Sequence, residues 1–577
     1  MTTVIAIYLL VLVGLFIPRV KPAMAFGGGA LVLVVTGHLG TGEFLRALTT
    51  PSLMILIILM VLAGAAQSYL PLASWLARGQ SGPRRFMLKM TGMTAVASSL
   101  MNNTAVVALL MGPVRSWAIS RGRSAHPLLM PLAFAATLGG MITVIGTSTN
   151  LVLNGLLEEN SFRILHTLDY LPIGLAVTGA GIVYLVIMAF KVLPDRGAPE
   201  REVRREYTVE TKIVLGGGYE GVSVQQAGLR QLHGLYLVEI LREGHLMAPV
   251  APGEILRAED RLFFAGDLDQ VRALTQSHTG LALPQDELTQ GAHESPLIEA
   301  MIPPGSDLIG RKVRDSQFRQ RFDAAIVAIH RHGEQMQGRI GDVVLQAGDL
   351  LLLVGGARFD DLSARSKHLY SLDARPAVKP IPRTKKWVAL AVMATLVTLL
   401  ALGHLDFLTT LLLAAASGGV LGFLQWRDVR QHIDWELMTV LVSALGFSLA
   451  LMRSGAPAEG IEWLQSNLGA AGPAVWMLLI FFVTTLATNA LSNVAAVSAI
   501  FPLVAAVVQQ GLLGHEIAFL ALAFGASNAF LTPFGYQTNL LVYGPGGYHT
   551  KDYVRLGIGL TVIYSLVVLS YLQFVLS

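Results

Sequence analysis

The chain has 577 residues, of which 53% are hydrophobic and only 14% are charged, a composition typical of membrane proteins. Its formal net charge of +4 is small for this length, and no dense run of lysine and arginine alternates with aromatic residues, so nucleic acid is not indicated as a partner. Cysteine is absent, which excludes disulfides, zinc–thiolate sites and thiol nucleophiles together.

Motifs that carry enzyme chemistry are also missing from the sequence. It contains no Ser-His-Asp arrangement, no H-E-x-x-H pattern and no P-loop, and its 14 histidines do not cluster at metal-ligand spacing. We therefore expect a protein that is not an enzyme.

Three apolar runs open the chain and predict membrane spans at 2–18, 23–39 and 52–70. The first run lacks a basic segment before it, so we expect a retained span and not a cleaved signal. Basic residues follow the first run at Arg19 and Lys21 and the third run at Arg78, Arg84 and Arg85. The positive-inside rule then places these links in the cytoplasm and the N-terminus outside.

A re-entrant hairpin is predicted at 86–114, because this apolar segment has basic residues on both flanks and is interrupted by the polar stretch Ser98–Thr104. The next span, at 127–158, is interrupted at Thr143–Asn150, and a further span at 171–193 returns to the cytoplasm. Residues 1–193 therefore form the predicted first membrane half.

Residues 194–383 differ in character from the rest of the chain. They hold 49 of its 80 charged side chains, and no apolar run there is long enough to span a bilayer, so we expect a soluble, cytoplasmic insert. Its segments Ile255–Gly266 and Val344–Gly355 resemble each other. Short β-branched runs between turn residues predict two small α/β modules, at about 205–283 and 295–372.

The second membrane half is predicted in 384–577, with spans at 387–403, 406–424 and 437–454 and a cytoplasmic link marked by Arg427 and Arg430. A second broken hairpin is predicted at 473–510, with its polar tip at Ala487–Ala496. The second interrupted span lies at 515–545, and a last span at 556–576 places the C-terminus outside.

The two halves share an internal repeat. Thr143–Gly155 and Thr532–Gly544 agree at six positions with one spacing, and the hairpin tips Asn102–Thr104 and Ser492–Asn493 are 390 positions apart. Each half has five crossings and one hairpin, and an odd number of crossings inverts the second half relative to the first. The sequence thus predicts an α-helical polytopic membrane protein built as an inverted repeat.

Interrupted helices in a bilayer indicate a binding site. Every main-chain amide and carbonyl in lipid needs a partner, so a broken helix persists only where it is buried in protein or lines a cavity. Paired interruptions in two halves mark the binding site of a transporter. A single Asn or Thr in a membrane helix is more often an interhelical hydrogen bond than a ligand. Here, however, four polar interruptions are related by one repeat spacing, and this favours a binding site formed by the four together.

The candidate residues form two overlapping sets. Amide and hydroxyl donors suit an anion, and carbonyl and hydroxyl oxygens suit a hard cation such as sodium. The predicted substrate-binding residues are Asn102, Asn103, Thr104, Thr149, Asn150, Ser492, Asn493, Thr538 and Asn539. The candidate sodium ligands are Asn103, Gly146, Thr147, Ser148, Asn150, Asn493, Gly535, Gln537 and Asn539.

Three of these stretches, Thr532–Tyr548, Gly146–Val152 and Leu100–Ala108, resemble the divalent anion/sodium symporter (SLC13-like) family, and the resemblance covers both membrane halves. The insert is similar to a pair of TrkA-C (RCK C-terminal) modules, chiefly at Ala258–Gly266 and Ala347–Gly355. Such pairs occur in the sulfate-permease-like branch of the family.

The resemblance implies an elevator-type secondary transporter of the inner membrane, usually a homodimer, with a nucleotide or another small ligand on the TrkA-C modules. The family's two Ser-Asn-Thr signatures map onto Asn102-Asn103-Thr104 and Ser492-Asn493-Val494. This chain departs from them at Asn102 and Val494. In dicarboxylate carriers the signatures contact the two carboxylates, so both departures count against dicarboxylates and against one of the usual sodium sites.

The predicted function is cation-coupled uptake, with sodium as the expected coupling ion, of a small divalent oxyanion such as sulfate. A sodium- or proton-coupled di- or tricarboxylate transporter is the alternative. A different class of function is an ion channel that is gated by its RCK-like modules. A potassium filter needs a ring of carbonyls from equivalent glycine-bearing loops, whereas this chain offers two hairpins with Asn tips.

Overall fold

The computed structural model describes the whole chain apart from a set of short segments. These are residues 16, 18–19, 68–71, 78–81, 194–208, 214, 217, 230–234, 244, 248–249, 267–280, 283–296, 332–333, 337–339, 357, 365, 367, 373–381, 402–403, 426–428, 430–432, 469–471 and 577. Some predicted features therefore lie outside the described residues, namely the cytoplasmic markers Arg19, Arg78, Arg427 and Arg430 and the module limits at 205, 283 and 295.

The N-terminal helical part of the protein contains ten helices in the described residues. They are α1 (Thr2–Leu15), α2 (Pro22–Val35), α3 (Thr41–Ala47), α4 (Pro51–Gln67), α5 (Leu72–Ala77), α6 (Pro83–Ser98), α7 (Asn103–Ile119), α8 (His126–Gly140), α9 (Ser148–Glu159) and α10 (Thr167–Val192). Proline opens α2, α4 and α6, where a missing amide hydrogen costs nothing because the first turn has no acceptor for it.

The C-terminal helical part follows the same plan. Its described helices are α15 (Arg383–Ala401), α16 (Phe407–Val420), α18 (Trp435–Arg453), α19 (Ala456–Leu468), α20 (Pro473–Ala490), α21 (Asn493–Gln509), α22 (His515–Ser527), α23 (Gln537–Tyr543) and α24 (Thr550–Leu576). Asp406 and Asp434 cap α16 and α18 by accepting main-chain N–H groups at 2.9 and 3.0 Å.

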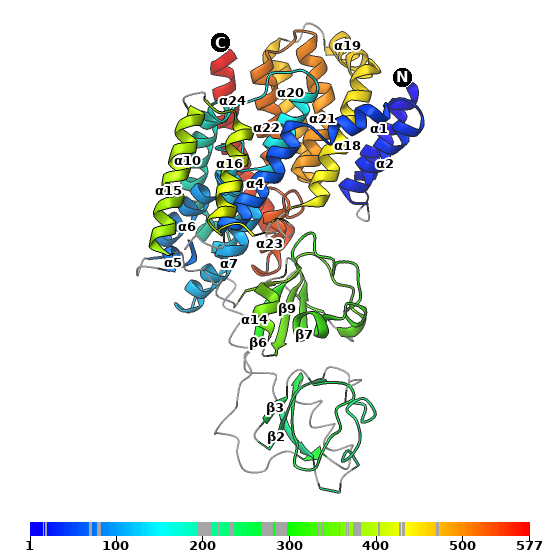
Figure 1. Ribbon diagram of the computed structural model, residues 1–577, viewed down its shortest axis with the longest axis vertical. Helices are drawn as coiled ribbons and strands as arrows, with labels where there is room; N and C mark the ends of the chain where they lie inside the picture. The colour runs from blue at the N-terminus through cyan, green and yellow to red at the C-terminus, as the bar shows by residue number, and fades with distance from the viewer. Residues whose placement is uncertain are drawn as a thin grey trace.

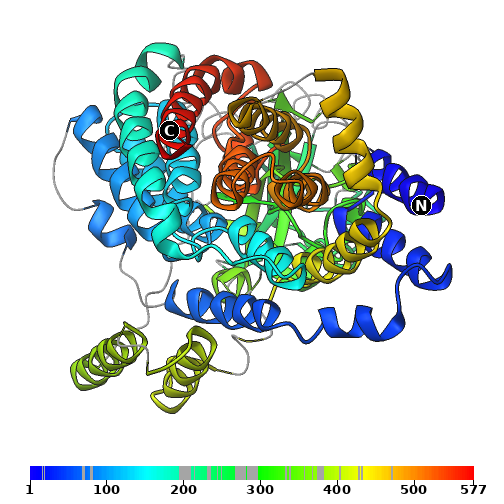
Figure 2. The same ribbon diagram turned by 90° about the horizontal axis from the view of Figure 1, so that it is seen from above.

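Equivalent helices recur at a nearly constant spacing. The hairpin arms α7 and α21 begin at Asn103 and Asn493, 390 positions apart, and each has 17 residues. The helices that follow them, α8 and α22, begin at His126 and His515, 389 positions apart. In both parts the first hairpin arm packs on this next helix, α6 on α8 and α20 on α22. Figure 2 shows the second hairpin and α22, in orange, near the centre of the bundle.

Four described helices, α10, α18, α20 and α24, are long and apolar enough to cross a membrane. Their outer faces carry exposed apolar side chains, such as Leu486 at 76% and Leu566 at 62% exposure. Large exposed apolar surface of this kind is typical of a face that meets lipid. Three short helices, α3, α5 and α19, were not predicted from the sequence. Each is too short to give a hydropathy signal, and α3 and α19 also mix charged with apolar residues.

The described part of the insert contains two five-stranded antiparallel sheets. The first comprises β1 (Val209–Ile213), β2 (Leu235–Arg242), β3 (His245–Met247), β4 (Arg261–Gly266) and β5 (Leu281–Ala282), in the order β3-β2-β4-β1-β5. The second comprises β6 (Leu297–Met301), β7 (Ala324–Arg331), β8 (Glu334–Gln335), β9 (Leu350–Gly355) and β10 (Tyr370–Ser371), in the order β10-β6-β9-β7-β8. Short helices accompany the second sheet: η1 (Val313–Asp315), α13 (Phe318–Phe322), η2 (Ile340–Asp342) and α14 (Phe359–Ala364).

The two sheets repeat each other in detail. Read from opposite ends, their strand orders match one for one. Arg242 pairs with Asp260 in the first sheet and Arg331 with Asp349 in the second, and in both pairs Nη2 and Oδ2 are 2.8 Å apart. The hydrogen bonds that Arg242 donates to Asp260 raise the pKa of Arg242 above its usual range. Both aspartates are only 1% exposed, so each pair stabilises the turn before the central strand.

The second sheet lies directly under the helical bundle, and the first sheet lies farther away (Figure 1). Met301 and Leu372 of the insert belong to the same buried apolar cluster as the helices, whereas the first sheet has an apolar cluster of its own. Both chain termini lie at the end of the bundle remote from the sheets (Figure 1).

Candidate functional site

The first broken helix is tied to the tip of the first hairpin. Between α8 and α9, the hydroxyl of Thr143 donates to the main-chain oxygen of Ser99 at 2.5 Å and accepts the amide of Gly146 at 3.0 Å. The side-chain amide of Asn150 donates to the carbonyl of Thr143 at 3.1 Å. These bonds satisfy main-chain groups that the interruption of the helix leaves without partners.

The second broken helix has the same set of bonds at the equivalent residues. Thr532 donates to the main-chain oxygen of Asn489 at 2.8 Å and accepts the amide of Gly535 at 3.1 Å. Asn539 donates to the carbonyl of Thr532 at 3.2 Å. The repeated motif thus encodes one hydrogen-bond network that is built twice.

Each hairpin tip holds a buried asparagine at the start of its second arm. Asn103 and Asn493 are both 2% exposed. Asn103 is hydrogen-bonded to Ser98, the last residue of α6, and Asn493 contacts Thr488 of α20 at 2.7 Å. Thr488 in turn donates to the carbonyl of Ala526 at 2.5 Å. The residues before the tip therefore hold the asparagines in place.

Both tip asparagines reach the same point of the second break. Asn103 donates from Nδ2 to the hydroxyl of Tyr536 at 2.7 Å. With its amide nitrogen turned toward the break, Asn493 donates to the carbonyl of Gly535 at 2.9 Å. Gly535 and Tyr536 are neighbours in the chain, so the two hairpin tips converge there. The Tyr536 hydroxyl also bonds to the side chain of Thr147, its equivalent in the first break.

The two parts of the chain cross over at the site. The second arm of the first hairpin, α7, packs against α23. The second arm of the second hairpin, α21, packs against α9. The hydroxyl of Thr104 donates to Gln537 Oε1 at 3.3 Å, and the hydroxyls of Thr137 and Thr538 are 3.4 Å apart. Each hairpin therefore meets the half-helix that follows the other part's break.

Two buried oxygens in the breaks have no hydrogen-bond partner among the described residues. They are Oδ1 of Asn150 and Oδ1 of Asn539, which occupy equivalent positions of the repeat. Both side chains are fully buried. A buried carbonyl oxygen without a donor is costly, so each of these two oxygens is available to a cation or a water molecule.

The predicted site residues differ in exposure. Thr149, Asn150, Thr538 and Asn539 are fully buried, and Thr147 is 4% exposed. Three residues cap helices: Asn102 accepts the amide of Thr104 at 2.9 Å, Thr147 that of Thr149 at 3.4 Å, and Ser492 that of Ala495 at 3.3 Å. Asn102 and Gln537 are exposed, Gly146 and Gly535 are buried, and Ser148 is half-buried. Asn102 therefore stands apart from the buried network.

Sequence reasoning missed Tyr536 and the roles of Ser98 and Thr488. Tyr536 gave no signal, because an aromatic residue in an apolar segment is ordinary. Ser98 and Thr488, however, are 390 positions apart, so the repeat spacing that links the tips also links these two residues. Applied to every polar residue near the tips, this spacing would have found them.

A buried pair of ionisable side chains lies at the start of α8 and of α24. His126 of α8 and Asp552 of α24 are 3.8 Å apart, and their side chains are 2% and 1% exposed. Asp552 also accepts the amide of His549 at 2.9 Å. No group of three His, Asp or Glu side chains in the described residues could hold a metal ion. Anion recognition at the hairpin tips would thus depend on neutral donors.

Comparison with known proteins identifies the family. Residues 7–527 match the family described as CitMHS, citrate transporter. The chain is 31% identical over 566 residues to the putative sulfur deprivation response regulator of Chlamydomonas reinhardtii, covering 93% of this chain and 95% of that protein. It is 31% identical over 507 residues to the uncharacterized transporter sll0640 of Synechocystis sp., and the match covers 85% of this chain and 82% of that protein. It is 26% identical over 365 residues to sodium/sulfate cotransporter 1 of C. reinhardtii, and the match covers 61% of this chain and 41% of that protein.

These relatives confirm the class that the sequence predicts, a multi-pass membrane transporter that is not an enzyme. The match of the family to most of the chain is what carries this conclusion. The chain belongs to the CitMHS citrate transporter family and is a secondary transporter of the anion and dicarboxylate type.

Proposed function

We propose that the chain imports a small divalent oxyanion, sulfate, together with sodium ions. The observation that carries the proposal is the pair of buried, unpartnered oxygens, Asn150 Oδ1 and Asn539 Oδ1, one in each broken helix. A sodium ion takes oxygen ligands, so an ion in each break would satisfy an oxygen that the protein leaves without a donor. The relatives named sodium/sulfate cotransporters support sodium and sulfate as the ions.

The two sodium sites would draw on the loops that interrupt the helices. In the first break, Gly146, Thr147 and Ser148 supply main-chain and hydroxyl oxygens beside Asn150. In the second, Gly535 and Gln537 lie beside Asn539. Asn103 and Asn493 complete these sets from the hairpin tips, where each bonds to the second break.

The anion would bind where the hairpin tips converge on Gly535 and Tyr536. The N-termini of α7 and α21 lie at these tips, and helix N-termini favour a negative charge. Asn102, Thr104 and Ser492 add neutral donors there, with Thr149 and Thr538 behind them. No arginine or lysine lies in the tips, so the co-bound sodium ions would balance the anion's charge.

The proposed architecture is an inverted repeat, residues 1–193 and 384–577, that works by an elevator mechanism as a homodimer in the inner membrane. The repeated network of the breaks and the crossing of α7 with α23 and α21 with α9 support it. In this arrangement the termini face outward and 194–383 lies in the cytoplasm. The position of both termini away from the sheets is consistent with this orientation (Figure 1).

The insert, with its two TrkA-C-like modules, would regulate transport through contacts with the two helices that carry the site. Arg115 of α7 forms an ion pair with Glu299 of β6. A methyl group at Gly112 of α7 would lie 2.7 Å from the carbonyl oxygen of Leu372, and one at Gly544, at the end of α23, would collide with Gly348. The second sheet is thus in close main-chain contact with both helices. A nucleotide or another small ligand of the modules would act through these contacts.

Di- or tricarboxylates are the alternative substrates. The family's description as citrate transporters favours them, whereas the departures at Asn102 and Val494 from the family's signatures count against them. The family is described as transporters, which also counts against the hypothesis of a gated ion channel.

Uptake into proteoliposomes tests the proposal. Labelled sulfate and labelled succinate are supplied in turn under an imposed sodium gradient and then under a proton gradient. Sulfate uptake that requires sodium is the expected result. Succinate uptake would replace the substrate assignment, and a response to protons alone would replace the coupling ion. If neither anion enters with either gradient, even after removal of the insert, the proposal is wrong.

A further inference from the structure

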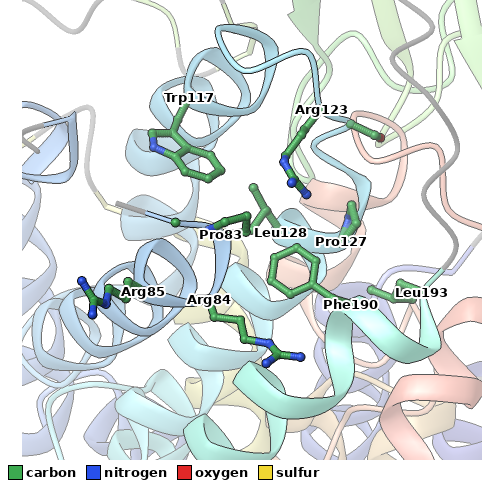
Figure 3. A pocket seen from close by; sticks show the side chains of 11 residues that line it. Pro83, Arg84, Arg85, Trp117, Arg123, Pro127, Leu128, Phe190 and Leu193 are labelled. Carbon is green, nitrogen blue, oxygen red and sulfur yellow. The ribbon is translucent and has the colours of Figure 1, made fainter. Parts of the chain in front are cut away.

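A cavity separate from the candidate transport site opens between the ends of four helices. Its volume is about 670 Å³, and it is lined from α6, α7, α8 and α10 (Figure 3). Leu193, one of its walls, directly precedes the insert, so the cavity lies at the end of the bundle that faces the sheets. By the positive-inside rule this is the cytoplasmic end.

Three arginines give the cavity a strong positive charge. Arg84 and Arg85 come from the first turn of α6, and Arg123 comes from the link between α7 and α8. All three side chains are exposed, and none has an acidic partner among the described residues. A fourth cation lies nearby, because the guanidinium of Arg121 stacks on the ring of Trp117 at 4.5 Å. Guanidinium groups gathered in one cavity create a positive potential that attracts anions.

The helix start at the cavity adds main-chain donors. Gly82 precedes α6 and has no side chain to cap it, and Pro83 has no amide hydrogen. The amides of Arg84 and Arg85 therefore lie in the first turn without an intrahelical acceptor. Such a helix N-terminus next to guanidinium groups is suited to a phosphate group, which guanidinium groups bind in a bidentate manner.

The remaining walls are apolar. Pro83, Pro127, Leu128, Phe190 and Leu193 also line the cavity, and in the view of Figure 3 Phe190 lies between Arg84 and Arg123. The ligand therefore needs an anionic group for the arginines and an apolar part for these walls. Basic pockets between membrane helices on the cytoplasmic side bind anionic lipid headgroups for this reason.

We propose that this cavity binds a phosphate-bearing anion and that the ligand contacts Arg84 and Arg123. The phosphate belongs either to an anionic phospholipid of the cytoplasmic leaflet or to a soluble phosphate compound. The site connects α6 to α8 and α10, and the other end of α6 carries Ser98, which holds Asn103 of the hairpin tip. An occupied cavity therefore fixes the base of the first hairpin against the helices behind it.

Binding to the purified full-length protein tests the proposal without any transport assay. Native mass spectrometry measures retention of phosphatidylglycerol and phosphatidylcholine by the wild type, by Arg84→Gln/Arg123→Gln and by the control Arg46→Gln. Arg46 is an exposed arginine on α3, outside the cavity. Thermal unfolding without ligand verifies that each variant is folded. The charge-retaining Arg84→Lys/Arg123→Lys shows whether positive charge is what the ligand requires.

We expect the wild type and Arg46→Gln to retain phosphatidylglycerol in preference to phosphatidylcholine. Removal of two arginines should weaken this binding by roughly 30-fold, and the lysine variant should keep most of it. In a second arm, inorganic phosphate is titrated while thermal unfolding is followed. A stabilisation that is present in the wild type and lost in Arg84→Gln/Arg123→Gln identifies a soluble phosphate as the ligand. The proposal is wrong if the glutamine variant binds lipid and phosphate as well as the wild type does.

Discussion

The side-chain amide of Asn103 donates to the hydroxyl of Tyr536 at 2.7 Å, although the two residues are 433 positions apart. This bond joins the tip of the first hairpin to the break of the second helical part. Tyr536 is the repeat equivalent of Thr147, and its hydroxyl bonds to that residue as well. One phenol therefore links both breaks and one hairpin tip at the point where Asn493 also arrives.

Tyr536→Phe should weaken sodium-dependent uptake. The change removes only the hydroxyl, leaves the half-buried ring in place and deprives the Asn103 amide of its acceptor, at a cost of about 1–3 kcal/mol. We expect the sodium concentration for half-maximal uptake to rise by about tenfold or more. Uptake into proteoliposomes at a series of sodium concentrations measures this shift.

The control for this experiment is Tyr571→Phe, at the far end of α24. It removes an equivalent hydroxyl outside the network of the hairpin tips. Unchanged sodium dependence in Tyr536→Phe would show that the bond between the two parts has no role in ion binding.

Asn150→Ala and Asn539→Ala should each abolish uptake while the protein stays in the membrane. Each removes an unpartnered oxygen and also the bond to Thr143 or Thr532 that holds the break. We expect the uptake rate to fall at least about tenfold in both, equivalent to roughly 1.4 kcal/mol or more. Uptake normalised to the amount of protein in the membrane measures the effect.

Asn160→Ala is the matched control, because Asn160 lies at the end of α9 and, among the described residues, its side chain bonds only to Leu156 of its own helix and to Ser448. It should transport at a rate near that of the wild type. Normal transport by both Asn150→Ala and Asn539→Ala would remove the breaks from the site.

The positions of the breaks could be predicted from the sequence because polar residues are conspicuous in apolar segments. Asn150 and Asn539 stand out for this reason, and the spacing of the internal repeat is enough to relate them to each other. Tyr536 could not be found in this way, because the sequence does not encode which aromatic hydroxyl will face a distant hairpin. The helices α3 and α19 were not predicted because charged residues interrupt their apolar pattern.

The contact between the insert and the helices was also beyond sequence reasoning. Gly112 and Gly544 are two of 58 glycines, and a close approach of two main chains leaves no pattern in either segment. The sheets themselves were easier to predict, since the segments Ile255–Gly266 and Val344–Gly355 resemble each other and contain β4 and β9. Docking depends on shape, which composition and periodicity do not report.

Gly544→Ala should loosen the second sheet from α23. The added methyl group would collide with the carbonyl of Gly348, and such overpacking costs about 1–3 kcal/mol. We expect faster hydrogen exchange in β9 and a changed uptake rate. Gly179→Ala is the control, because a methyl group at that position of α10 meets nothing within 4 Å. Exchange in β9 that is as slow in Gly544→Ala as in the control would contradict close docking.

Replacement of residues 200–380 by a short linker should alter the rate or regulation of uptake and leave the choice between sulfate and succinate unchanged. Every predicted site residue lies outside this segment, so selectivity has no structural reason to change. The deletion does remove Glu299, the ion-pair partner of Arg115, and the main-chain contacts to Gly112 and Gly544. A changed substrate profile would contradict the division into a transport part and a regulatory insert.

A smaller deletion separates the two sheets. Replacement of 205–283 removes only the first sheet, whose apolar cluster contains no helix residue, and leaves Glu299 and Leu372 against α7. If regulation passes through the second sheet, the smaller deletion should keep the basal uptake rate of the full chain, and the larger one should not. Equal rates in the two deletions would mean that the contacts at α7 and α23 do not affect transport, since these contacts are what distinguishes them.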